Sequence, residues 1–274
     1  MHGSTQSPAA TGWRGLDTPR RNNFFHGKMM DVYHFELETA YGIGLRRLLN
    51  RLVHGAGVVC GLDVERTDDH RAITVTPGVA LDGWGREIVV PARSAPVTVP
   101  PELIERVCGA DGDTKGKRPP RDQDQDRGYR DRGWVTAVLC YHECESDPAP
   151  VLDGDCGTTQ PCTPGTISER YRIGFEPGRA DPPDVSCRFP DVLRDGEIDY
   201  GAIARWVTRE CPRPPRDPCI PLANLRLSDD GRPAGDVEIE DVQIEVREVV
   251  LGRLLFDVLS RVVEEEQSGD SWRR

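Results

Sequence analysis

The chain has 274 residues, 37% of them hydrophobic and 30% charged, and its 28 glycines and 23 prolines make up about a fifth of it. This composition predicts a modest core and much loop, in one large domain or two small ones. A net charge of −11 disfavours nucleic-acid partners. The sequence has no run of about 18 apolar residues that could cross a membrane, and residues 1–21 lack the apolar stretch of a secretory signal. We therefore expect a cytoplasmic protein.

The first predicted element is a helix over residues 31–53, after a polar tail, residues 1–21, that we expect to be flexible. Asp31 is a good N-cap residue, and the sequence His54-Gly55-Ala56-Gly57 supplies the glycine that commonly ends a helix. Between these ends, apolar residues recur every three or four positions, as on one face of a helix. They are Leu37, Tyr41, Leu45, Leu48 and Leu52.

A block of short strands follows this helix. We expect the strands at residues 58–64, 72–75, 79–81 and 87–90, with a short extension over 96–99. The segment Asp82-Gly83-Trp84-Gly85 would form a hairpin loop, because glycine tolerates the backbone angles of tight turns. A short helix is predicted over 102–107, so residues 22–107 are expected to form a helix plus β-hairpin module.

Residues 108–133 are rich in charge, glycine and proline and nearly free of apolar side chains. A segment of this kind cannot offset the entropy cost of ordering its backbone. We interpret it as a disordered charged linker on the surface, with an electrostatic interaction arm as the alternative.

Residues 134–274 are predicted to form a second β-rich region. Strands are expected at 134–141, 170–175 and 220–227, with a cysteine-rich loop over 144–166 and a helix that Asp199 would cap. The last predicted element is a helix over 241–266, which would pack either against the N-terminal helix of the same monomer or against another subunit. Its apolar face would carry Leu251, Leu254, Leu255, Val258, Leu259 and Val262.

Nine cysteines are many for a chain without an apparent export signal, and an odd number cannot all pair within the chain. Four of them, Cys140, Cys144, Cys156 and Cys162, lie in and beside the predicted loop. Zinc takes four sulfur or nitrogen ligands in a tetrahedron, so these residues are a candidate structural zinc site that would staple the loop. Buried free thiols and disulfides are the alternatives.

Nothing in the sequence predicts catalysis. The glycines Gly55, Gly57 and Gly61 follow a predicted helix and precede a strand, which is the reverse of the order in a dinucleotide-binding motif. No phosphate-binding loop or nucleophile elbow occurs. We therefore expect no enzymatic activity; the enzymatic alternative would be a hydrolase with a pocket lined by groups such as Asp82, Glu87 or His54.

Three segments carry a more specific signal. Residues 21–38 read RNNFFHGKMMDVYHFELE, residues 49–62 read LNRLVHGAGVVCGL, and residues 77–90 read PGVALDGWGREIVV. The first two resemble the opening of an uncharacterised bacterial family associated with gene clusters for phage-tail-like contractile injection systems, and the third resembles a β-hairpin module of phage tail and baseplate proteins. Met29 and Met30 stand where the family usually has a leucine pair.

The resemblance implies a structural subunit of such a particle, at its baseplate or as an adaptor at its cap end. We therefore predict an α+β fold, with a β-rich body of short antiparallel strands flanked by an N-terminal and a C-terminal helix. The partners would be sheath, tube, baseplate or cap proteins, with several copies of this chain in the assembly. The alternative is a cytoplasmic metal-stapled adaptor unrelated to such particles. The predicted interface residues are Phe24, Phe25, Tyr33, Phe35, Leu255 and Leu259.

Overall fold

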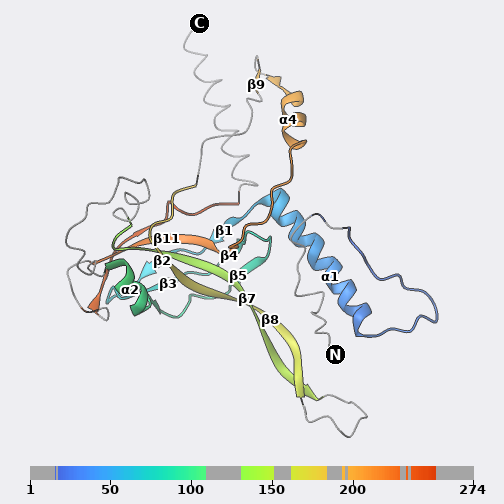
Figure 1. Cartoon of the computed structure of the whole chain (residues 1–274), viewed down its shortest axis with the longest axis horizontal. Coiled ribbons are helices and arrows are strands. Elements are labelled where there is room, and N and C mark those ends of the chain that lie inside the picture. The colour runs from blue at the N-terminus through green and yellow to red at the C-terminus, as the bar shows by residue number, and fades with distance from the viewer. Residues whose placement is uncertain are drawn as a thin grey trace, which may run out of the picture.

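The computed structural model describes residues 16, 18–108, 131–150, 162–183, 193–194, 197–228, 233 and 236–250. It shows a β-rich body of antiparallel sheets, one long helix near the N-terminus and a few short helices (Figure 1). This arrangement confirms the predicted α+β class.

Figure 1 shows the helices and strands, which are numbered in chain order. The helical elements are α1 (Val32–Leu49), its π-helical continuation η1 (Asn50–His54), α2 (Pro101–Cys108) and α4 (Tyr200–Val207). The first group of strands comprises β1 (Gly57–Gly61), β2 (Val64–Arg66), β3 (Ala72–Val75), β4 (Gly78–Leu81), β5 (Glu87–Val90) and β6 (Val97–Thr98). The second comprises β7 (Trp134–Pro150), β8 (Cys162–Pro177), β9 (Leu193–Arg194), β10 (Glu197–Ile198), β11 (Ile220–Leu227) and β12 (Ile239–Gln243).

The strands form three main sheets in which every pairing of neighbours is antiparallel. Their orders are β1-β4-β5, β2-β3-β6 and β12-β11-β7-β8, and β9 pairs with β10 as a separate ribbon. The predicted hairpin forms as β4 and β5, with Gly78 opposite Val90 and Leu81 opposite Glu87.

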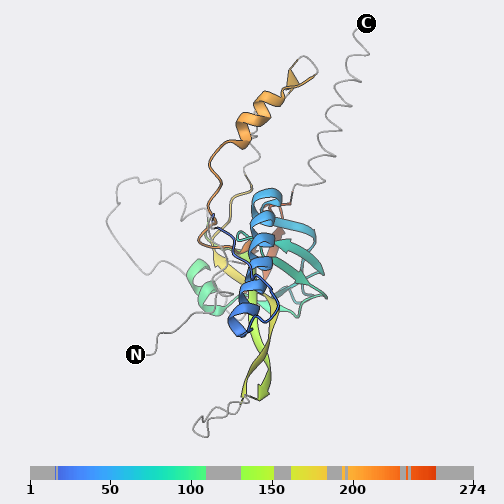
Figure 2. The same ribbon diagram turned by 90° about the vertical axis from the view of Figure 1, so that its right-hand side faces the viewer.

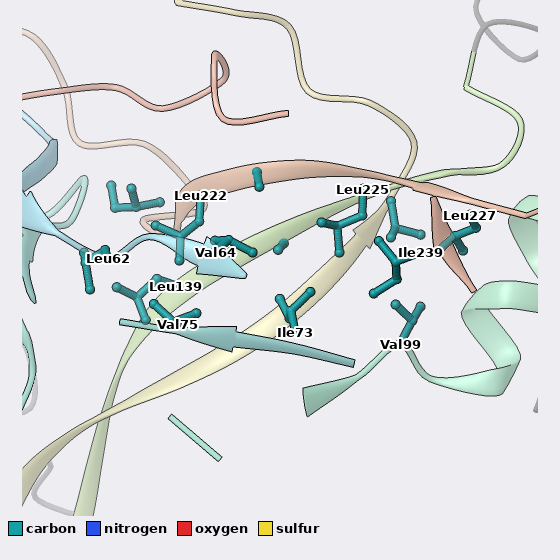
Figure 3. Packing of buried hydrophobic residues seen from close by; sticks show 14 of the residues in the cluster. Leu62, Val64, Ile73, Val75, Val99, Leu139, Leu222, Leu225, Leu227 and Ile239 are labelled. Atoms are coloured by element: carbon teal, nitrogen blue, oxygen red, sulfur yellow. The ribbon is translucent and has the colours of Figure 1, made fainter. Parts of the chain in front are cut away.

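The core lies between the four-stranded sheet and the small sheets of the N-terminal half. Side chains of β11 and β7, such as Leu222 and Leu139, point toward Ile73 and Val75 of β3 (Figure 3). Most of these side chains are completely shielded from solvent. Burying a leucine or isoleucine stabilises a fold by about 1.5–3 kcal/mol, so this cluster holds the two halves of the sequence together.

The structure corrects the prediction of a loop over 144–166. Residues 144–150 continue β7 and residues 162–166 belong to β8, and the two strands pair from Val135 opposite Pro177 to Pro150 opposite Cys162. The part of this pair beyond Tyr141 leaves the body as a projecting two-stranded ribbon (Figure 2). Hydroxyl contacts across the ribbon, such as Ser146 Oγ to Thr166 Oγ1 at 2.8 Å, support the pairing.

The start of the predicted C-terminal helix is also corrected. Residues 239–243 form β12, which pairs with β11, and residues 244–250 form turns and a short bridge to β1. The rest of the predicted helix, residues 251–266, lies outside the described residues. So do 109–130 of the predicted linker and most of the predicted tail.

Candidate protein–protein interface

Helix α1 begins with a reciprocal cap, as the sequence predicts for Asp31. The Asp31 carboxylate accepts a hydrogen bond from the His34 backbone N–H (3.3 Å), and the Asp31 N–H donates to His34 Nδ1 (3.3 Å). Desolvation raises the pKa of Asp31, but the hydrogen bonds and charge interaction with His34 outweigh it and lower the pKa overall. The cap fixes the direction in which the chain enters the helix.

The loop before α1 is tied back to the helix by Asn22, which is buried. The Asn22 backbone N–H donates to Glu38 Oε2 on the second turn of α1 (3.1 Å), and the Asn22 side chain accepts from Lys28 Nζ. The loop reverses at Gly27, whose φ of +80° suits glycine, and the Lys28 N–H donates to the Phe25 carbonyl (3.2 Å). The loop is therefore held in place before any partner binds.

This folded loop and the first turn of α1 present four exposed aromatic side chains, which we call the aromatic end of α1. Phe24 and Phe25 are each 63% exposed, Phe35 is 62% exposed and Tyr33 is about half exposed. Tyr33 and Phe35 are two positions apart and therefore lie on different sides of the helix. Exposed apolar surface of this extent commonly marks a protein contact.

The other end of α1 is anchored to the body through the β4–β5 hairpin loop. Asn50 Nδ2 donates to the Gly85 carbonyl (3.0 Å) and to Glu87 Oε1 (2.8 Å), and Arg46 Nε pairs with the same carboxylate (2.8 Å). Gly85 has a φ of +81°, and a Cβ added there would lie 2.0 Å from the Arg47 carbonyl oxygen. The helix is thus fixed at its C-terminal half, and its aromatic end projects from the body (Figure 1).

A stacked cluster joins this anchor to the base of the β7–β8 ribbon. The guanidinium groups of Arg86 and Arg47 lie 4.4 Å and 5.6 Å from the centre of the Tyr141 ring. Arg86 is held by Asp82, which is fully buried, through a contact of 2.6 Å. Burial, and then the hydrogen bond from the Tyr141 hydroxyl to Glu143 (2.8 Å), raise the pKa of Tyr141. Sequence analysis missed this cluster, because Arg47, the Asp82–Arg86 pair and Tyr141 come together only in the folded chain.

The structure thus gathers Phe24, Phe25, Tyr33 and Phe35 at one end of a projecting helix. The other two predicted interface residues, Leu255 and Leu259, lie outside the described residues. No helix in the part of the chain that the structure describes is long and apolar enough to cross a membrane.

The predicted zinc site needs a correction at Cys140, which forms a disulfide with Cys219. A disulfide sulfur offers no thiolate to a metal. Cys144 lies four residues further along the extended strand β7, about 13 Å away, whereas sulfurs on one zinc lie within about 4 Å of each other. Cys162 lies at the start of β8, and Cys156 lies outside the described residues. Nowhere in the described ranges do three or more His, Cys, Asp or Glu side chains cluster as metal ligands.

The groups named for a hydrolase pocket have structural partners. Asp82 holds Arg86, and Glu87 holds Asn50 and Arg46. His54 is exposed at the end of η1. Glu87 therefore attaches α1 to the hairpin, and Asp82 holds the hairpin loop itself in shape.

No family model and no curated protein matches this chain. Four chains of solved structures match it, among them a chain described as "Structure of the type VI secretion system TssK-TssF-TssG baseplate subcomplex". The two are 14% identical with a TM-score of 0.31, and the match covers 78% of this chain and 58% of the other. This chain therefore spans less than two thirds of the length of that protein. A likeness of this size assigns neither a fold nor a function.

Proposed function

We propose that this protein is a non-enzymatic structural subunit of a contractile, phage-tail-like injection particle, located at the baseplate or at the cap end. The resemblance of residues 21–62 and 77–90 to the family described above points to the particle. The structural observation that supports the proposal is the aromatic end of α1. It is exposed, it projects from the body, and hydrogen bonds of Asn22 and Lys28 fix the loop that carries Phe24 and Phe25.

Assembly through this end would rest on burial of apolar area. Phenylalanine and tyrosine bury about 150–250 Å² each and dominate interface energies. Tyr33 and Phe35 lie on different sides of the helix, so a socket in a neighbouring subunit would cover both rings, whereas a flat surface would cover one of them. Since Asn22 and Lys28 already fix the loop that carries Phe24 and Phe25, little ordering entropy would be lost on binding.

The proposed place of assembly is the cytoplasm, with several copies of this chain in each particle. The other partners would be tube, sheath, baseplate or cap proteins. No contact in the described residues favours one of these over the others.

The proposal is tested by tagging the protein in cells that make the particle. Gentle lysis, pelleting through a sucrose cushion and electron microscopy with a gold label should place the label on one end of the rods. Protein that stays in the supernatant, while unlabelled rods pellet, would overturn the proposal.

A variant pair tests the role of the aromatic end. Phe24→Ala/Phe25→Ala should remove the protein from the pellet without changing its own stability, because both rings are exposed. The matched control is Tyr200→Ala on α4, which removes an aromatic ring of 76% exposure from a different surface and should pellet as the wild type does. Equal pelleting of both variants would exclude the aromatic end as the contact.

A further inference from the structure

The C-terminal half of α1 with η1 has an exposed stripe of its own, which we call the α1 seam: Gly42, Arg46, Leu49 and Val53. These positions are spaced by four, three and four residues, which is the spacing of a seam between two packed helices. Leu49 is 57% exposed and Val53 is 69% exposed. At Gly42, no atom lies within 4 Å of where a Cβ would be, so a second helix could approach closely there.

The opposite face of the same half is already occupied. Gly44 is buried, Arg47 stacks on Tyr141, Asn50 binds the hairpin loop, and Arg51 donates to the Pro212 carbonyl (2.6 Å). The seam is therefore exposed although the other side of this half of the helix contacts the body. On the seam itself, Arg46 pairs with Glu87 (2.8 Å), while the side chains of Leu49 and Val53 stay exposed.

The described chain ends beside this seam. The Val250 N–H donates to the Val58 carbonyl (3.0 Å), and the Val58 N–H donates to the Glu248 carbonyl (2.8 Å). Val58 lies on β1, only four residues after the end of η1 at His54 (Figure 1). Arg247 fixes this exit by donating to the Leu222 carbonyl (2.6 Å), and its burial lowers its pKa. Val250, the last described residue, therefore lies beside β1, the strand that follows η1.

Residues 251–262, which follow the described part of the chain, match the seam in length and in the spacing of their apolar residues. The apolar positions of its sequence run from Leu251 to Val262, which is 12 residues, and the seam from Gly42 to Val53 is also 12 residues. As helices, both would be about 18 Å long.

We propose that residues 251–262 of this chain dock along the α1 seam of the same molecule, antiparallel to α1. Gly252 would permit the reversal after Val250, and Leu255, Val258 and Leu259 would cover Leu49 and Val53. The docked segment would end near Gly42 and leave the aromatic end free for a partner, so it does not compete with the proposed function.

Hydrogen exchange measured by mass spectrometry on the full chain tests this docking. We compare the wild type with Leu255→Asp/Leu259→Asp, and with Ser260→Asp, which adds a charge at a position outside the apolar stripe. Amides of residues 42–54 should exchange about tenfold faster in the double variant, while the Ser260→Asp chain should keep the wild-type rate.

Three outcomes would overturn the proposal. The first is equal exchange in the wild type and the double variant. The second is equally fast exchange in the double variant and the control. The third is protection that grows with protein concentration, which would show that the segment docks on a second copy. Phe24→Ala/Phe25→Ala should retain the protection whatever it does to pelleting, so this proposal and the proposed function fail separately.

Discussion

The attachment of α1 to the hairpin loop can be tested at Gly85 by replacement with alanine. Gly85 has a φ of +81°, and the added Cβ would lie 2.0 Å from the Arg47 carbonyl oxygen. Gly27 is a matched control, because its φ is +80° and its Cβ would meet nothing within 4 Å. Both substitutions impose the same backbone strain, but only Gly85→Ala pushes against the helix.

The expected magnitudes follow from these contacts. A left-handed alanine costs about 1–2 kcal/mol, which applies to both variants. At Gly85 either the helix or the loop must also shift, which breaks the two Asn50 hydrogen bonds, at about 1 kcal/mol each. We expect Gly85→Ala to lower the free energy of unfolding by about 3 kcal/mol and Gly27→Ala by about 1 kcal/mol.

Urea unfolding followed by circular dichroism measures both values on the full chain. Hydrogen exchange of the amides of residues 42–54 should also be faster in Gly85→Ala, because the helix loses its hydrogen bonds to the hairpin loop. An equal loss of stability in the two variants would refute the reasoning, since the contact between Gly85 and Arg47 would then contribute nothing.

Two further predictions concern Tyr141 and the disulfide. The pKa of Tyr141 is raised above its ordinary 10.0 in the folded state, so the unfolded chain loses the proton first and stability should fall as the pH rises above about 10. Urea unfolding of wild type and Tyr141→Phe at several pH values checks this, and identical slopes would contradict it. The Cys140–Cys219 bond closes a loop over a sequence separation of 79, so its reduction should cost about 4 kcal/mol. Non-reducing peptide mapping should find this pair, and unfolding with and without reductant gives the cost; unchanged stability would show that the bond is absent.

Much of the local structure was predictable because its signals are local. The N-cap at Asp31, the glycine after His54 and the glycine-containing loop between β4 and β5 are each specified by a short stretch of sequence. The strand over 220–227 was found in full, since it is a short apolar run bounded by turn residues. Phe24, Phe25, Tyr33 and Phe35 are exposed, and their role as contact residues stays a prediction.

The elements that were predicted wrongly from the sequence are strands whose hydrogen-bonding partners lie further along the chain. Residues 144–150 are polar and contain prolines, and they become a strand only because residues 162–168 lie opposite them. Residues 241–243 fall within the range of the predicted C-terminal helix, yet their backbone pairs with β11, which places Val242 opposite Leu225. In both cases hydrogen bonds to a distant partner outweigh a weak local preference.

Local signals along the chain were enough to predict the β-rich class and the long helix with aromatic residues at its start. The pairing of Cys140 with Cys219 and the anchoring of α1 at Gly85, with its aromatic end free, could be seen only in the folded chain. The physical reason is that local backbone preferences act over a few residues, whereas burial and close backbone approach are properties of segments that meet only after the chain has folded.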